Sequence, residues 1–224
     1  MHGNPSSTTL SSGILAGMGL PAGDSELVQI MDAAFADAAR RAGPWLVCCP
    51  GCTQCCHGAF AIDALDAQRL ASGMEALRTQ NPNLAAELQR RARIWLYEHG
   101  PTFPGDLVTG RLGDTEADRA GFEDYANQAP CPALSPSTGL CDIYPWRPMT
   151  CRIFGPPVRI QADAAGSAAL GHCELCFTGA TTAQIAACEM PIPHGLEQQL
   201  LDEILARGET PSHHETIVAF ALLR

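Results

Sequence analysis

Residues 48–56 read Cys-Cys-Pro-Gly-Cys-Thr-Gln-Cys-Cys, which places five thiols within nine residues. Four of them form a C-x-x-C-x-x-C-C motif, and these are Cys49, Cys52, Cys55 and Cys56. This spacing lets pairs of thiolates converge on one metal, and thiolates are strong ligands for zinc and for iron–sulfur clusters. A hydrophobic core has no need of so many small soft side chains in one stretch. We therefore expect the fold to be organised around a metal held by this segment.

A second cysteine-rich region follows at residues 131–176. Its five cysteines comprise Cys131, Cys141 and Cys151, spaced ten residues apart, and the C-x-x-C pair Cys173 and Cys176. Together with the first motif they make nine predicted metal ligands. One tetrahedral zinc or one [4Fe–4S] cluster takes about four thiolates. The sequence therefore predicts either two sites or one polynuclear site with bridging sulfurs, and adjacent Cys55 and Cys56 are expected to point apart.

The order of these motifs resembles the YkgJ-like CxxCxxCC family of zinc- or iron-chelating domains. The resemblance rests on Cys49 to Cys56 with Gly58, Phe60 and Ile62, on Cys131-Pro132-x-Leu134, on Gly139-x-Cys141-x-Ile143-Tyr144, and on Arg147-Pro148-x-x-Cys151-Arg152-x-Phe154. It covers residues 49–154 and implies metal chelation by these cysteines. It names no reaction, and it leaves zinc, iron and a [4Fe–4S] cluster open as cofactors.

Other residues near the motifs are expected to support the metal ligands or to have structural roles. Arg147 and Arg152 bracket Cys151 and are expected to offset thiolate charge by donating to sulfur, as residues around the ligands often do. Lone histidines are more often solvated than ligating, so His57 and His172 are expected to be bystanders. The remaining candidates are expected to be structural thiols or aromatic cover, and they are Cys48, Cys188, Tyr144 and Trp146.

Composition narrows the function classes. The chain has 224 residues with 46% hydrophobic side chains, enough for one domain with its own core. A net charge of −10 disfavours nucleic acid, and no apolar run is long enough to predict a membrane span. The odd number of cysteines, 11, and the absence of a secretion signal favour a reduced, cytoplasmic setting over a disulfide scaffold.

The periodicity predicts a mainly α fold, a small helical domain in which two irregular cysteine-rich segments join around a metal site. Residues 1–23 are expected to be a flexible leader and residues 24–224 a single domain, with the metal-binding core at about 48–176. Helices are expected at about 25–42, 63–80, 84–98, 196–207 and from Ser212, where Glu215 would complete a capping box. A short strand is expected near residues 58–62, and residues 100–130 are expected to be irregular.

Two further functions compete with a metal-binding module. Cys48, Cys52 and Cys55 have the C-x-x-x-C-x-x-C spacing of radical S-adenosylmethionine enzymes, so an iron–sulfur-dependent enzyme of methyltransferase or redox type is the alternative. The helical pattern lacks the alternating strands of a barrel and a nucleotide-binding glycine loop, which disfavours it. Thiol–disulfide exchange is disfavoured because no thioredoxin-like pattern surrounds the C-x-x-C pairs.

Overall fold

The computed structural model describes residues 19–160, 169–208 and 215–224, and within them the protein is mainly α-helical, as predicted. The helices are α1 (Asp24–Ala42), α2 (Ala64–Gln80), α3 (Pro82–His99), α4 (Glu116–Glu123), α5 (Met149–Ile153), α6 (Thr182–Ala187), α7 (His194–Ala206) and α8 (Val218–Ala221). Three two-residue antiparallel pairs join β1 (Ala61–Ile62) to β6 (Thr216–Ile217), β2 (Gly105–Asp106) to β3 (Arg111–Leu112), and β4 (Val158–Arg159) to β5 (Leu170–Gly171).

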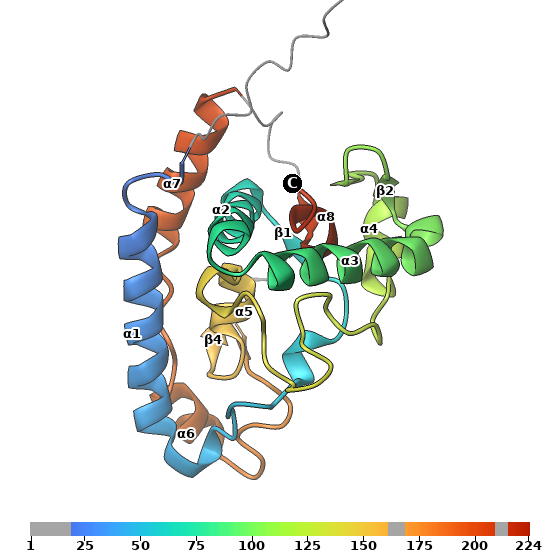
Figure 1. The fold of residues 1–224 in the computed structure, drawn as a ribbon. Coiled ribbons are helices and arrows are strands. Elements are labelled where there is room, and N and C mark those ends of the chain that lie inside the picture. Colours follow the sequence, from blue (N-terminus) through green and yellow to red (C-terminus); the bar gives the residue numbers. More distant parts are fainter. Residues whose placement is uncertain (1–18, 161–168, 209–214) are drawn as a thin grey trace, which may run out of the picture.

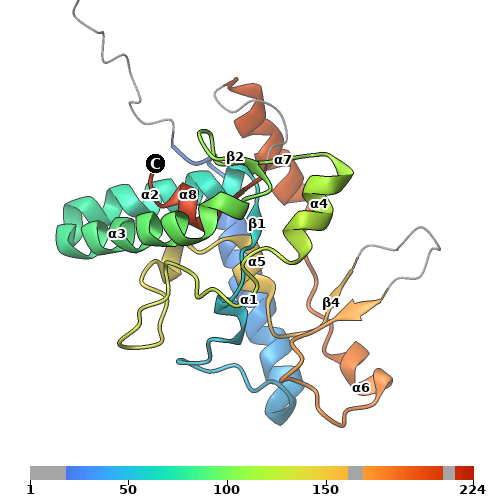
Figure 2. The same cartoon turned by 90° about the vertical axis from the view of Figure 1, so that its right-hand side faces the viewer.

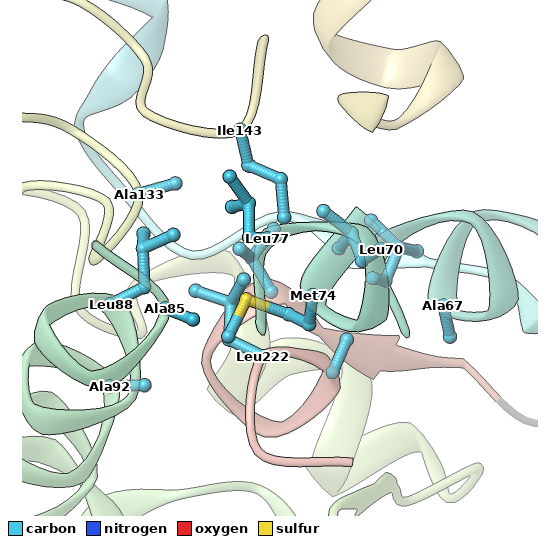
Figure 3. Packing of buried hydrophobic residues seen from close by; sticks show 13 residues of the cluster. Ala67, Leu70, Met74, Leu77, Ala85, Leu88, Ala92, Ala133, Ile143 and Leu222 are labelled. Atoms are coloured by element: carbon cyan, nitrogen blue, oxygen red, sulfur yellow. The ribbon is translucent and has the colours of Figure 1, made fainter. Parts of the chain in front are cut away.

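Helices α2 and α3 form a hairpin that supplies the central hydrophobic core. Asn81 joins them: its amide N–H caps the end of α2, and its side chain accepts from the Leu84 amide at the start of α3. The buried side chains of α2 and α3 meet those of α8 and of a loop that contributes Ala133 and Ile143 (Figure 3). Burying one such side chain stabilises the fold by about 1.5–3 kcal/mol. The same core therefore fixes the loop that carries Cys131 and Cys141.

Helices α1 and α7 lie side by side along one edge of the molecule (Figure 1). Their apolar faces pack together with part of α2 and with Met149 at the start of α5. The cysteine-rich segments lie below the α2–α3 hairpin in both views (Figures 1 and 2). Segments far apart in the sequence thus meet beneath the α2–α3 hairpin.

A buried ion cluster joins helices α1, α2 and α5. The guanidinium of Arg69 on α2 is 1% exposed and donates to the carboxylates of Asp24 on α1 and Asp66 on α2. Asp66 also accepts from the backbone N–H of Met149, at 2.9 and 3.1 Å, and so holds the N-terminus of α5. Burial raises the pKa of Asp66, and the positive charge of Arg69 opposes that shift.

The structure corrects two local predictions. Residues 100–130 are not wholly irregular, because they contain α4, whose capping box pairs Thr115 with Asp118. The expected helix from Ser212 is also wrong where it can be compared. Thr216 and Ile217 pair with β1 as strand β6, and only α8 is helical after it. Ser212 itself, and residues 1–18 of the expected leader, lie outside the described residues.

The other expected elements are confirmed. The predicted helices near 25–42, 63–80, 84–98 and 196–207 correspond to α1, α2, α3 and α7, and the short strand is β1. Asp63 caps α2 as expected, since its carboxylate accepts from the Asp66 amide. Within the described ranges, none of the helices has the length and apolar character needed to cross a bilayer.

Replacing Arg69 by methionine should lower the free energy of unfolding by about 3–5 kcal/mol, because two buried carboxylates would lose their partner. Urea unfolding followed by circular dichroism measures this loss. The matched control is Arg90→Met, which removes an exposed pair with Glu87 and should leave the midpoint nearly unchanged. An Arg69→Met variant as stable as the control would show that the ion cluster does not hold α1, α2 and α5 together.

Candidate metal site

Ten of the eleven cysteines lie in loops or short helices that converge below the α2–α3 hairpin, and all eleven are free thiols. The first cysteine segment turns tightly, with the Cys52 amide donating to the Cys49 carbonyl at 3.0 Å. The 3-10 helix Gln54–Cys56 then presents Cys55 and Cys56. The expectation that these two thiols point apart is wrong, because they hydrogen-bond to each other. The Cys173–Cys176 segment forms a similar turn, with the Cys176 amide donating to the Cys173 carbonyl at 2.9 Å. Nine of the eleven thiols divide into two groups, and Cys49 and Cys188 belong to neither.

The first group, called here the arginine-lined group, comprises five thiols: Cys55, Cys56, Cys131, Cys141 and Cys151. Backbone hydrogen bonds position it. The Cys131 amide donates to the Cys56 carbonyl at 2.7 Å, and the Gly58 amide donates to the Ala129 carbonyl at 2.8 Å. Cys141 returns beside Leu134 in a short antiparallel bridge. Cys151 comes from α5, which Asp66 holds in place.

The electrostatics show that these five thiols interact with one another. Burial raises the pKa of Cys131 to about 12 and that of Cys141 above its usual range. Burial also raises the pKa of Cys151, and the neighbouring thiols of Cys131, Cys141 and Cys55 raise it further. Metal binding removes the protons of such thiols, so its affinity depends on compensation of the resulting negative charge.

Arg147 supplies that compensation. Its Nε and Nη1 atoms are buried and have no hydrogen-bond partner, while its Nη2 lies 3.7 Å from Asp32. Its positive charge lowers the pKa values of Cys55 and Cys141, although burial outweighs it at Cys141. The Tyr144 ring, 3.8 Å from the guanidinium carbon, covers its outer side. Buried N–H donors without partners are rare, and here they belong to a guanidinium whose charge acts on two thiols of the group.

Arg91 on α3 adds a second guanidinium to this group. It donates to the Leu134 carbonyl at 2.6 Å and to the Asp142 carboxylate, which fixes the loop between Cys131 and Cys141. Its Nε is also buried without a hydrogen-bond partner. The sequence analysis missed Arg91, because it lies 40 residues before Cys131 in a regular helix and no local spacing connects the two.

The second group, called here the four-thiol group, comprises Cys48, Cys52, Cys173 and Cys176. The Sγ atoms of Cys48 and Cys176 lie 4.0 Å apart. Burial raises the pKa of Cys48 to about 12, and the thiols of Cys176, Cys173 and Cys52 add to that shift. Burial likewise raises the pKa of Cys173, and the neighbouring thiols of Cys176 and Cys52 raise it further. Cys48, expected to be structural, therefore lies among predicted ligands.

The comparison with known families follows this geometry. The family model described as "CxxCxxCC: Putative zinc- or iron-chelating domain" matches residues 48–174. The chain belongs to this family. The match covers more than half of the chain and includes both cysteine-rich regions, except Cys176. No curated protein and no solved structure matches the chain.

The structure of this CxxCxxCC-family protein places two predicted site residues apart from both groups. Cys49 is exposed, and none of the described contacts involves its thiol. Its role as a ligand stays a prediction. Each nitrogen of the Arg152 guanidinium donates to another partner: Asp32, the Pro145 carbonyl and the Arg147 carbonyl. Arg152 therefore holds the loop before α5, and its donation to a thiolate stays a prediction.

The remaining candidates have structural partners. His57 and His172 contact the backbone carbonyls of Thr53 and Cys173. The Trp146 ring packs so closely on α2 that a Cβ at Gly73 would lie 2.6 Å from it. Cys188 is 4% exposed and packs in an apolar cluster with Ala42. The C-x-x-x-C-x-x-C frame of the alternative enzyme is divided, since Cys48 and Cys52 lie in one group and Cys55 lies in the other.

The residues of both thiol groups are chemically suited to bind a metal, but their side chains, as the structure describes them, are not arranged as ligands around a single ion. Thiolates, buried guanidinium donors without partners, and one sulfur pair at 4.0 Å are the chemistry that a thiolate-bound metal requires. In the part of the chain that the structure describes, however, no three His, Cys, Asp or Glu side chains converge as ligands of a single ion. A single ion would therefore require thiol side chains to move inward, whereas a larger cluster needs its sulfurs further apart.

In the metal-free protein, Cys55 should be the first thiol of the arginine-lined group to react with iodoacetamide. A hydrogen bond from the Cys56 thiol, a backbone hydrogen bond and the charge of Arg147 lower the pKa of Cys55 to about 6, although burial opposes them. Cys55 is therefore a thiolate above pH 6, and its labelling should reach half its maximal rate near that pH. Peptide mapping after labelling between pH 5 and about 8.5 measures this.

The variant Arg147→Gln should move the labelling midpoint of Cys55 upward. Arg159→Gln is the matched control, since Arg159 is exposed and pairs with Glu189. A midpoint at the ordinary cysteine value of about 8.5 in the unaltered protein would contradict the predicted shift.

Proposed function

We propose that this protein is a metal-chelating protein whose arginine-lined group holds an iron–sulfur cluster rather than a single zinc ion. The observation that carries the proposal is the combination of five neighbouring thiols with buried guanidinium N–H groups that have no partner. A cluster takes about four cysteine ligands, so one of the five would remain free or exchange with another. The proposal is consistent with the family description, which names zinc or iron.

Two features favour the cluster over zinc at this group. The group holds five thiols that influence one another's protonation, one more than the about four thiolates that a single zinc ion takes. The site is also partly shielded from water, since its five cysteines are partly buried and Cys131 and Cys141 pack against the α2–α3 core. Hydrogen bonds to sulfur and exclusion of solvent are the means by which proteins tune such clusters.

The roles of this chain's residues follow from their positions. Arg147 would donate from its buried Nε and Nη1 to the sulfur atoms of the bound group, and Tyr144 would shield its outer face. Arg91 would hold the Cys131–Cys141 loop and contribute a second positive charge. When bound, an iron–sulfur cluster supplies either one-electron transfer or a cross-link between the cysteine segments. We further propose a reduced, cytoplasmic location, because thiolate ligands require the free thiols that all eleven cysteines provide.

The first test is analysis of iron, zinc and acid-labile sulfide in protein purified without oxygen, with a visible absorption spectrum. We expect a brown sample with iron and sulfide, and we expect both to be lost when Cys131 and Cys151 are replaced together by serine, because only three thiols of the group then remain. Cys188→Ser is the matched control, because that thiol is buried but belongs to neither group. A colourless wild-type protein without sulfide would refute the cluster, and zinc lost in the double variant would then leave simple zinc chelation.

Arg147→Gln should lower metal affinity of the arginine-lined group by about 10–100-fold, because it removes the donors to the thiolates while keeping every ligand. Competition with a chromophoric chelator measures the change, and Arg159→Gln again serves as the control. Unchanged affinity in Arg147→Gln would show that its buried nitrogens do not serve the metal.

A further inference from the structure

The four-thiol group is separate from the arginine-lined group in every interaction that the structure records. The thiols that act on Cys48 are those of Cys176, Cys173 and Cys52, whereas those that act on Cys151 are Cys131, Cys141 and Cys55. Arg147 acts on members of the second set, Cys55 and Cys141. The nine thiols therefore fall into two sets, and together they exceed the about four thiolates that one zinc ion or one [4Fe–4S] cluster takes.

Direct contacts hold the two turns of the four-thiol group against each other. The Phe177 amide donates to the Trp45 carbonyl at 2.8 Å, which ties the segment before Cys48 to the segment after Cys176. The Gln54 side chain donates to the Glu174 carboxylate at 2.7 Å, which ties the Cys52 turn to the Cys173–Cys176 turn. These cross-links bring together residues more than 100 positions apart in the chain.

Gly155 permits the close approach. Its φ of +117° is a conformation that side chains rarely adopt, and a Cβ at this position would lie 2.8 Å from the Cys48 Sγ. Its carbonyl also accepts from the Cys173 amide at 3.2 Å. One residue therefore contacts the Cys48 thiol on one side and positions Cys173 on the other.

We propose that Cys48, Cys52, Cys173 and Cys176 form a second metal site that binds one Zn²⁺ with four thiolates. Zinc–sulfur bonds of about 2.3 Å in a tetrahedron place the sulfurs about 3.8 Å apart. The Cys48–Cys176 separation of 4.0 Å has this spacing. Cys52 and Cys173 are half-buried in tight turns, and their side chains would have to rotate to complete the set, because no three ligands converge within the described residues. Binding releases the thiol protons and cross-links the segment after α1 to the segment before α6.

The site differs from the family motif in its ligands. It uses Cys48 in place of the motif residue Cys49, and it uses Cys176, which lies beyond the matched residues 48–174. It does not depend on the proposed cluster, because none of its thiols belongs to the arginine-lined group. Its occupancy can therefore be tested independently.

The test is zinc and iron analysis of the anaerobically purified full chain and of paired variants. Cys48→Ser and Cys176→Ser should each lose about one zinc per chain, while iron and sulfide stay at the wild-type level. Cys49→Ser is the matched control for Cys48, being its exposed neighbour, and Cys188→Ser is the control for Cys176, being buried in the same apolar cluster. Both controls should keep their zinc, and so should Cys131→Ser.

Several results would overturn the proposal. These are wild-type zinc in Cys48→Ser, zinc lost equally in Cys49→Ser, iron lost together with the zinc, or a Cys48–Cys176 disulfide in place of metal in the purified protein. If circular dichroism shows that Cys176→Ser is unfolded, the exposed Cys48→Ser variant decides alone. A wild-type protein without iron would refute the cluster but leave this zinc assay unaffected, so the two failures are distinguishable.

Discussion

The arrangement of this protein depends on one buried guanidinium. Arg69 lies where α1, α2 and α5 meet, and its two carboxylate partners come from α1 and α2. Leaving either carboxylate unpaired in the interior is costly, so the three helices are restrained to one relative position. Asp66 extends this restraint to α5, because its carboxylate accepts a hydrogen bond from the Met149 amide at the start of that helix. The location of Cys151, two residues further along α5, follows from this contact.

The thiols impose an opposing constraint. Burying sulfur atoms near one another disfavours their ionised forms, which is why burial and neighbouring thiols raise the pKa values of Cys48 and Cys151. In the arginine-lined group, the positive charges of Arg147 and Arg91 oppose this effect by lowering the pKa values of nearby thiols. In the four-thiol group, the neighbouring groups that act on Cys48 are thiols, so a divalent cation itself would have to neutralise them. The two groups therefore suit different bound species.

The helical framework was predictable because its causes are local. Apolar residues recur at helical spacing in α1, α2 and α3, and Asp63 and Asn81 cap α2 and α3. The C-terminal segment was not predictable in this way. Thr216 and Ile217 pair with β1, more than 150 residues earlier, and this long-range pairing overrides a local capping pattern. Helix α4 was missed because it is short and has no buried residue to mark it.

The sequence by itself determined which residues can bind metal and which family the chain belongs to, because ligand type and motif spacing are properties of the chain. Only the tertiary structure decided how the thiols are shared. It separates Cys52 from Cys55, places Cys48 rather than Cys49 beside Cys176, and brings Arg91 to Cys131. The partner thiols lie up to 128 residues apart in the chain. No local spacing encodes contacts of that range; the packing of α1, α2, α3 and α5 does.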